Sequence, residues 1–114
     1  MRVIIIACYK YEGKRISKCD FNEVDIISFK DIKKYIGRED CLIVDLREDM
    51  EYRRAHIKTA VNIEYNSRGI TIPEKHRKSL IIFYCDSGNR ALIMAKVMSN
   101  AGYRTIAVAD RFTH

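Results

Sequence analysis

The sequence predicts an α/β fold: a doubly wound, mainly parallel five-stranded sheet with helices on both faces, preceded by an extra N-terminal strand or hairpin. The chain has 114 residues, of which 47% are hydrophobic and 32% charged, and this suits one globular domain over residues 1–114. Short apolar runs alternate with helical patterns, as in repeated strand–helix units. Two runs, Cys41–Asp45 and Leu80–Cys85, are almost continuously apolar, which is typical of parallel strands covered on both faces.

The first 23 residues predict one or two strands outside this repeat. Val3–Cys8 is an apolar run of strand length, Glu12-Gly13 suits a turn, and a second short strand is expected to return near Ile16. The apolar run is shorter than a signal-peptide core, and nothing approaches the ~20 apolar residues of a membrane span. We therefore expect a cytoplasmic protein with no membrane partner.

The remaining elements follow in chain order. Ser28, with Asp31 three residues later, is a helix start signal, and Gly37 is a stop signal. The segment from Glu48 to Arg54 carries its acids first and its bases last, which suits the dipole of a short helix. Further strands are expected at residues 24–27, 60–63 and 105–108, and a well-buried helix at residues 90–101.

Polar residues follow the predicted parallel strands at the points where they end. In a doubly wound sheet, the ligand site lies beyond the carboxyl ends of the strands. That rule brings Asp45, Arg47, the segment that begins at Cys85, and Asp110-Arg111 to one edge of the sheet.

The segment Cys85-Asp86-Ser87-Gly88-Asn89-Arg90 joins a buried strand to a buried helix and carries the chemistry. Gly88 can take a positive φ, and a tight turn there aims backbone N–H groups inward to form a nest for an anion. The N-terminus of the following helix adds partial positive charge, and Arg90 adds a cation. These features favour the thiolate of Cys85, the form that attacks a sulfur donor. Taken alone, the segment fits a catalytic cysteine and a buried cysteine that ends a core strand equally well.

Two motifs in this sequence resemble those of the rhodanese family. Cys85 to Arg90 has the length of the rhodanese active-site loop, which begins with the catalytic Cys and ends with Arg or Thr. Residues 45–63 are similar to the second family pattern, with Asp45-x-Arg47, Glu51-Tyr52, Ala55-His56-Ile57 and Ala60-x-Asn62-Ile63. The resemblance covers residues 24–112 as the family core and leaves residues 1–23 as an N-terminal extension.

The resemblance implies a sulfurtransferase that carries sulfane sulfur as a persulfide on Cys85. It implies a cradle for that persulfide, formed by Asp86, Ser87, Gly88, Asn89 and Arg90, with Asp45 and Arg47 bracing it and His56 packed as a structural residue. The expected partners are a thiosulfate or persulfide donor and a thiol, cyanide or other nucleophilic acceptor, with a sulfur-relay protein as a further candidate. No cofactor is expected, and no metal either, because the histidines and cysteines lack ligand spacing.

Several residues depart from the family pattern. Ala55 replaces the usual Gly before His56, with an effect expected only in that loop. The usual final helix has no counterpart after Phe112, so the C-terminus is shortened and we expect one wall of the site to be open or completed by a partner. Asp86 places a carboxylate second in the loop, where it opposes anionic donors and partly cancels the charge of Arg90. The sequence therefore predicts a persulfide donor in preference to thiosulfate.

Other functions remain open. A non-catalytic rhodanese-like module that binds or regulates a partner protein is one alternative. A Cys-dependent phosphatase or arsenate reductase is another, disfavoured because four residues rather than five separate Cys85 from Arg90. The net charge of +6 favours anionic partners, but no RNA-binding motif accompanies the basic segment 53–78, so a nucleic-acid partner is not expected.

Overall fold

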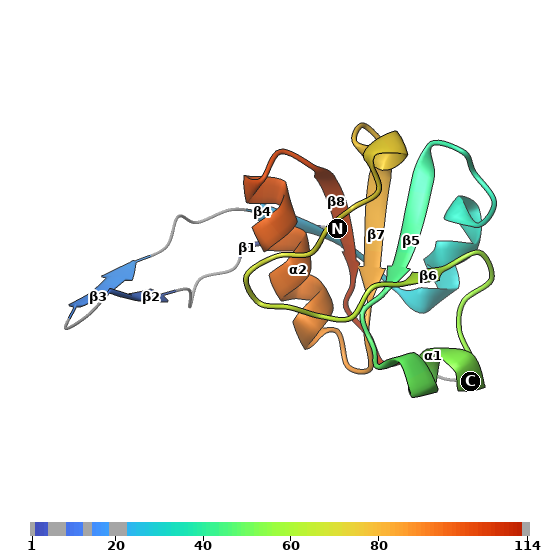
Figure 1. Cartoon of the computed structure of the whole chain (residues 1–114), viewed down its shortest axis with the longest axis horizontal. Helices are drawn as coiled ribbons and strands as arrows, with labels where there is room; N and C mark the ends of the chain where they lie inside the picture. Colours follow the sequence, from blue (N-terminus) through green and yellow to red (C-terminus); the bar gives the residue numbers. More distant parts are fainter. Residues whose placement is uncertain (1, 5–8, 13–14, 19–22, 113–114) are drawn as a thin grey trace.

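The structure is a computed structural model that describes residues 2–4, 9–12, 15–18 and 23–112. Its main sheet has six strands in the order β1-β4-β8-β7-β5-β6 (Figure 1). The strands of this sheet are β1 (Arg2–Ile4), β4 (Glu23–Ile27), β5 (Cys41–Asp45), β6 (Val61–Asn62), β7 (Leu80–Tyr84) and β8 (Arg104–Val108). Strand β1 pairs antiparallel with β4, and the other neighbours are parallel. The predicted five-stranded parallel sheet is therefore confirmed, with β1 as an added edge strand.

The two most apolar runs of the sequence form neighbouring strands in the middle of this sheet. Strands β5 and β7 pair in parallel register from Cys41 opposite Leu80 to Asp45 opposite Tyr84. All five residues of β5 are buried, as are the last four of β7. Covering on both faces explains why neither strand alternates apolar with polar residues.

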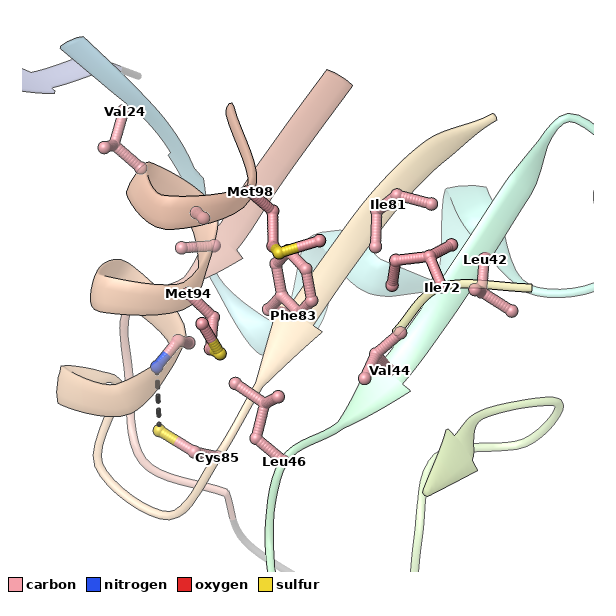
Figure 2. Packing of buried hydrophobic residues seen from close by; sticks show 13 residues of the cluster. Val24, Leu42, Val44, Leu46, Ile72, Ile81, Phe83, Cys85, Met94 and Met98 are labelled. Atoms are coloured by element: carbon pink, nitrogen blue, oxygen red, sulfur yellow. Dashed lines mark hydrogen bonds between the residues drawn. The ribbon is translucent and has the colours of Figure 1, made fainter. Parts of the chain in front are cut away.

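Helices cover both faces of the sheet. The helix α2 (Asn89–Asn100) packs on one face, where Phe83, Met94 and Met98 belong to a first buried cluster (Figure 2). The 3₁₀ helix η1 (Phe29–Tyr35) packs on the other face, where its Ile32 joins Ile82 in a second cluster. Side chains alternate along β7, so consecutive residues of that strand enter opposite clusters.

The helix predicted after Ser28 is a 3₁₀ helix. Asp31 accepts hydrogen bonds from the backbone N–H and the hydroxyl of Ser28, at 3.4 and 3.0 Å, so the predicted start signal operates. A 3₁₀ helix has three residues per turn, which aligns Phe29, Ile32 and Tyr35 along one edge. All three contact the second cluster, so the tighter helix buries a narrow apolar edge.

The other differences from the predicted elements are small. The helix α1 (Asp49–Arg54) and β6 are each shorter than predicted, and a 3₁₀ turn η2 (Glu74–His76) was not predicted. Strands β2 (Tyr9–Glu12) and β3 (Arg15–Lys18) form a separate antiparallel pair beyond the β1 edge (Figure 1). The strand predicted at Val3–Cys8 is represented by β1, and its residues 5–8 lie outside the described residues. No helix in the described part of the chain is long and apolar enough to cross a membrane.

Candidate active site

Cys85 lies directly after β7, where the chain turns into α2. Its Sγ accepts hydrogen bonds from the backbone N–H of Gly88 at 3.2 Å and from that of Ala91 at 3.4 Å. Figure 2 shows the second of these bonds, with Cys85 beside Leu46 at the foot of the first cluster. The residue is 1% exposed, so the sulfur is held beneath the surface by two donors at the start of a helix.

Gly88 gives the segment its shape. Its φ is +94°, in the left-handed region that other residues rarely adopt, and it stands immediately before α2. A Cβ at this position would overlap the carbonyl oxygen of Ala109. Glycine is therefore required here for two independent reasons: the left-handed backbone conformation and the close approach of Ala109.

The charged residues of the segment pair with each other. Nη2 of Arg90 donates to Oδ2 of Asp86 at 3.1 Å, four residues apart. Their side chains are 35% and 51% exposed, so the pair lies at the surface while the sulfur lies below it. Ser87 and Asn89 are exposed on the same turn. The carbonyl of Asp86 accepts the backbone N–H of Phe112 at 2.9 Å, which ties the segment to the chain after β8.

Asp45 and Arg47 form a buried ion pair below this segment, on the opposite face of the sheet from the sulfur. Nη2 of Arg47 lies 2.8 Å from Oδ2 of Asp45, with both side chains 3% exposed or less. The same carboxylate accepts the Tyr84 hydroxyl at 2.6 Å, and that hydroxyl accepts the backbone N–H of Ile57 at 3.0 Å. Because Tyr84 precedes Cys85, the network fixes the backbone from which the sulfur is presented.

The electrostatics of this network follow from burial and pairing. Burial alone would lower the pKa of Arg47, but the hydrogen bond and charge of Asp45 outweigh it and the pKa is raised. Burial, together with the hydrogen bond to Asp45, raises the pKa of Tyr84 well above its ordinary range. Both groups therefore keep their protons, so Arg47 is a cation and Tyr84 a neutral phenol.

Sequence reasoning missed two residues of this site, Tyr84 and Phe112. The guanidinium carbon of Arg47 lies 4.3 Å from the centre of the Phe112 ring, which also packs at 5.5 Å from the ring of Tyr84. The parallel register that places Tyr84 beside Asp45 was a usable signal for the first residue. Phe112 was noted only as a residue after the last strand, and its contacts with Arg47 and Tyr84 join segments that are distant in the sequence.

Three residues noted in the sequence lie away from the sulfur or serve other elements. Asp110 accepts the backbone N–H of Phe29 at 3.0 Å and so supports the start of η1. Arg111 follows it as an exposed residue. His56 stacks on Tyr52 at 3.8 Å between ring centres, and its Nδ1 lies 2.7 Å from the Tyr52 carbonyl oxygen. The residue is exposed rather than packed inside the fold, and its structural role stays a prediction.

The arrangement suits a sulfur that carries negative charge. Backbone N–H groups at a helix N-terminus stabilise an anion, and here they are aimed at a single sulfur atom. Among the residues that the structure describes, no group of three or more His, Cys, Asp or Glu side chains could hold a metal ion. The two N–H donors make Cys85 a candidate cysteine nucleophile.

Comparison with known proteins finds a matching family, related proteins and a similar solved structure. The family model described as the Rhodanese-like domain matches residues 28–111. The thiosulfate:glutathione sulfurtransferase of Saccharomyces cerevisiae is 31% identical over 108 residues, covering 82% of this chain and 78% of that protein. The uncharacterized protein YibN of Escherichia coli is 27% identical, covering 76% of this chain and 63% of that protein. A solved structure of an uncharacterized Saccharomyces cerevisiae protein superimposes with a TM-score of 0.63 and 29% identity, covering 75% of this chain and 84% of that one.

Proposed function

The chain belongs to the rhodanese-like domain family, and we propose that it is a sulfurtransferase that carries sulfane sulfur as a persulfide on Cys85. One observation carries the proposal: Sγ of Cys85 accepts two backbone N–H bonds at the N-terminus of α2. Such donors stabilise a thiolate before the reaction and a persulfide anion after it.

The reaction is a double displacement. The Cys85 thiolate attacks the outer sulfur of thiosulfate, a sulfur–sulfur bond forms to Cys85, and sulfite leaves with the electron pair of the bond that breaks. In the second step a thiolate or cyanide attacks the outer sulfur of the persulfide. Thiocyanate, or the persulfide of the acceptor, then leaves and the Cys85 thiolate is restored. An alkyl persulfide donor follows the same path with a thiolate as the leaving group.

The other proposed site residues position the Cys85 sulfur and determine the charge around it. Gly88 donates to the sulfur and allows the turn, while Asp86, Ser87, Asn89 and Arg90 complete the cradle around the exposed side. Asp45 and Arg47 are positioning residues, because their network fixes Tyr84 and hence the backbone at Cys85. The name of the yeast relative gives thiosulfate as its donor and glutathione as its acceptor, so we propose a small sulfane donor and a thiol acceptor for this chain as well.

Intact mass measurement tests the proposal. The reduced protein is incubated with thiosulfate, and separately with a low-molecular-weight persulfide, and then with cyanide. We expect a gain of one sulfur atom that cyanide discharges and that Cys85→Ser abolishes. Cys41→Ser is the matched control, because Cys41 is also a buried free cysteine but lies at the start of β5, at the opposite edge of the sheet. Loading that survives in Cys85→Ser, or none in the wild type from either donor, contradicts the proposal.

A partner-binding module without catalysis is the second candidate function. The observation that favours it is the burial of the thiol, since Cys85 is only 1% exposed. The mass experiment separates the two, because a binding module with a folded and reduced Cys85 gains no sulfur.

A further inference from the structure

We propose that residues 109–112, the chain that follows β8, form a clasp that keeps the loop of residues 85–90 closed around the sulfur of Cys85. This inference rests on the proposed sulfurtransferase function, because it assigns a control of access to the same cysteine. Sulfur is exchanged at Cys85 only when the clasp releases the loop, through a local opening of the fold.

The burial of the sulfur makes an opening necessary. Cys85 is only 1% exposed, and Gly88, whose N–H donates to Sγ at 3.2 Å, is buried as well. In a displacement at sulfur, the attacking Sγ, the transferred sulfur and the leaving group lie close to one line. Even a donor as small as thiosulfate needs more room than a buried Sγ offers. The loop must therefore move before sulfur is exchanged.

Two contacts attach this loop to the clasp. The backbone N–H of Phe112 donates to the carbonyl of Asp86 at 2.9 Å. At Gly88 the backbone of Ala109 lies so close that an added Cβ would overlap its carbonyl oxygen. The two donors to Sγ, by contrast, belong to the loop and to the first turn of α2, at Gly88 and Ala91 (Figure 2). Release of the clasp therefore frees the loop on the side away from α2.

The clasp is itself held against η1 and the end of β7. The Asp110 carboxylate accepts the backbone N–H of Phe29 at 3.0 Å. The Phe112 ring packs at 5.4 Å from the ring of Phe29 and at 5.5 Å from that of Tyr84. The guanidinium carbon of Arg47 lies 4.3 Å from the centre of the same ring. Asp110 and Phe112 therefore hold the clasp in the position from which it contacts the loop.

The exposure of the clasp makes its release easier than unfolding of the sheet. Asp110 and Arg111 are exposed, and Ala109 and Phe112 are half-buried, whereas the last four residues of β7 are buried. Segments with few buried contacts open locally at a lower free energy than the whole fold. The closed state can therefore dominate while a minor open state admits the donor to Cys85.

Alkylation of the buried cysteines by iodoacetamide, followed by peptide mass mapping, measures this opening. Cys41 is an internal control for global unfolding, because it is also buried but lies at the start of β5, at the opposite edge of the sheet. Asp110→Ala removes the acceptor that holds the clasp to η1. Alkylation of Cys85 should then accelerate about tenfold, the effect of about one lost hydrogen bond, with the rate at Cys41 unchanged.

A second pair of variants separates the Phe112 ring from its backbone N–H. Phe112→Ala removes the ring, whereas Phe112→Pro removes both the ring and the N–H that donates to Asp86. Alkylation of Cys85 should therefore be faster in Phe112→Pro than in Phe112→Ala. Equal rates in these two variants, or no acceleration in Asp110→Ala, overturn the clasp. Equal acceleration at Cys41 and Cys85 in the clasp variants overturns it too, since it reports global unfolding.

Asp31→Ala is the matched control. Asp31 also accepts hydrogen bonds at the start of η1, from the N–H and hydroxyl of Ser28, but it is not part of the clasp. This variant should leave the alkylation rate of Cys85 as in the wild type. The same acceleration as in Asp110→Ala would assign the effect to η1 and overturn the clasp.

Sulfur loading tests the consequence for the proposed function. With glutathione persulfide as the donor, the rate at which Cys85 gains sulfur, followed by intact mass, should rise in Asp110→Ala by the same factor as its alkylation. Faster alkylation with an unchanged rate of loading overturns the control of sulfur exchange and leaves the sulfurtransferase function intact. Loading in neither the folded wild type nor the clasp variants overturns the function itself and the inference with it.

Discussion

Replacing Gly88 with alanine is expected to weaken both the fold and the proposed sulfur loading. The residue has φ +94°, its N–H donates to Sγ of Cys85 at 3.2 Å, and a Cβ would overlap the carbonyl oxygen of Ala109. The substitution therefore forces a strained backbone and pushes apart the loop and the chain that follows β8. Both movements carry the N–H of residue 88 away from the sulfur.

The magnitude follows from two separate effects. A left-handed backbone costs about 1–2 kcal/mol for a residue with a Cβ. A steric overlap in a packed region costs a further ~1–3 kcal/mol. The chain offers a matched control in Gly37, which has φ +79° but nothing within 4 Å of an added Cβ. Gly37→Ala should therefore lose only about 1–2 kcal/mol, and Gly88→Ala about 2–5 kcal/mol.

Urea denaturation, with the same m-value for the wild type and both variants, measures the loss of unfolding free energy. Intact mass after incubation with a sulfur donor measures the loading of Cys85. Gly37→Ala should load like the wild type, whereas Gly88→Ala should load more slowly at equal fraction folded. Equal losses of unfolding free energy in the two variants would refute the steric part of this reasoning. Full loading in Gly88→Ala would refute the role of its N–H in holding the sulfur.

Three further predictions concern the network below the loop. Phe112→Ala removes the ring that lies 4.3 Å from the guanidinium carbon of Arg47 and should loosen the end of β7. Alkylation of Cys85 by iodoacetamide should then accelerate about fivefold, whereas Phe112→Tyr should react at the wild-type rate. Burial and the hydrogen bond to Asp45 raise the pKa of Tyr84, so the folded state holds this proton more tightly than the unfolded state does. The free energy of unfolding should therefore fall by about 1.4 kcal/mol per pH unit above about pH 10. Tyr84→Phe should lack this slope when urea midpoints are compared between about pH 9 and pH 11. Asp45→Ala leaves the Arg47 charge buried without its partner and should lower unfolding free energy by about 3–5 kcal/mol.

Each of these predictions has an outcome that opposes it. An unchanged alkylation rate in Phe112→Ala would mean that the contact of the Phe112 N–H with the Asp86 carbonyl holds the loop without help from the ring. The same alkaline slope in Tyr84→Phe as in the wild type would assign that slope to other groups. A loss below about 1 kcal/mol in Asp45→Ala would mean that water or another group satisfies Arg47 in the variant.

The central fold could be predicted because its signals are local. The apolar runs at Cys41–Asp45 and Leu80–Cys85 have no polar alternation, which is typical of strands buried on both faces. The rule that ligand sites lie beyond the carboxyl ends of parallel strands then brought Asp45 to the edge where Cys85 lies, and the register of β5 and β7 confirms it. The pairing of Asp86 with Arg90 was also within reach, because residues four apart meet at the start of a helix.

What could not be predicted depends on contacts between distant segments. The need for glycine at position 88 comes partly from the carbonyl of Ala109, which no local pattern reveals. The 3₁₀ form of η1 brings Phe29, Ile32 and Tyr35, at a spacing of three, against the second cluster, which is formed by distant segments. Phe112 enters the site because the chain after β8 crosses back over the ends of β5 and β7, and its ring reaches Arg47 and Tyr84 there.

At the end of β7, consecutive side chains point to opposite faces of the sheet, so the supporting network and the sulfur lie on different faces. Tyr84 points to one face of the sheet, where its hydroxyl joins the buried pair of Asp45 and Arg47, and Cys85 points to the other, beneath the first turn of α2. The sulfur can therefore be surrounded by apolar side chains and backbone donors without any buried charge beside it. The charges of the segment itself lie at the surface, on Asp86 and Arg90, whereas a change in the buried pair of Asp45 and Arg47 should alter stability first.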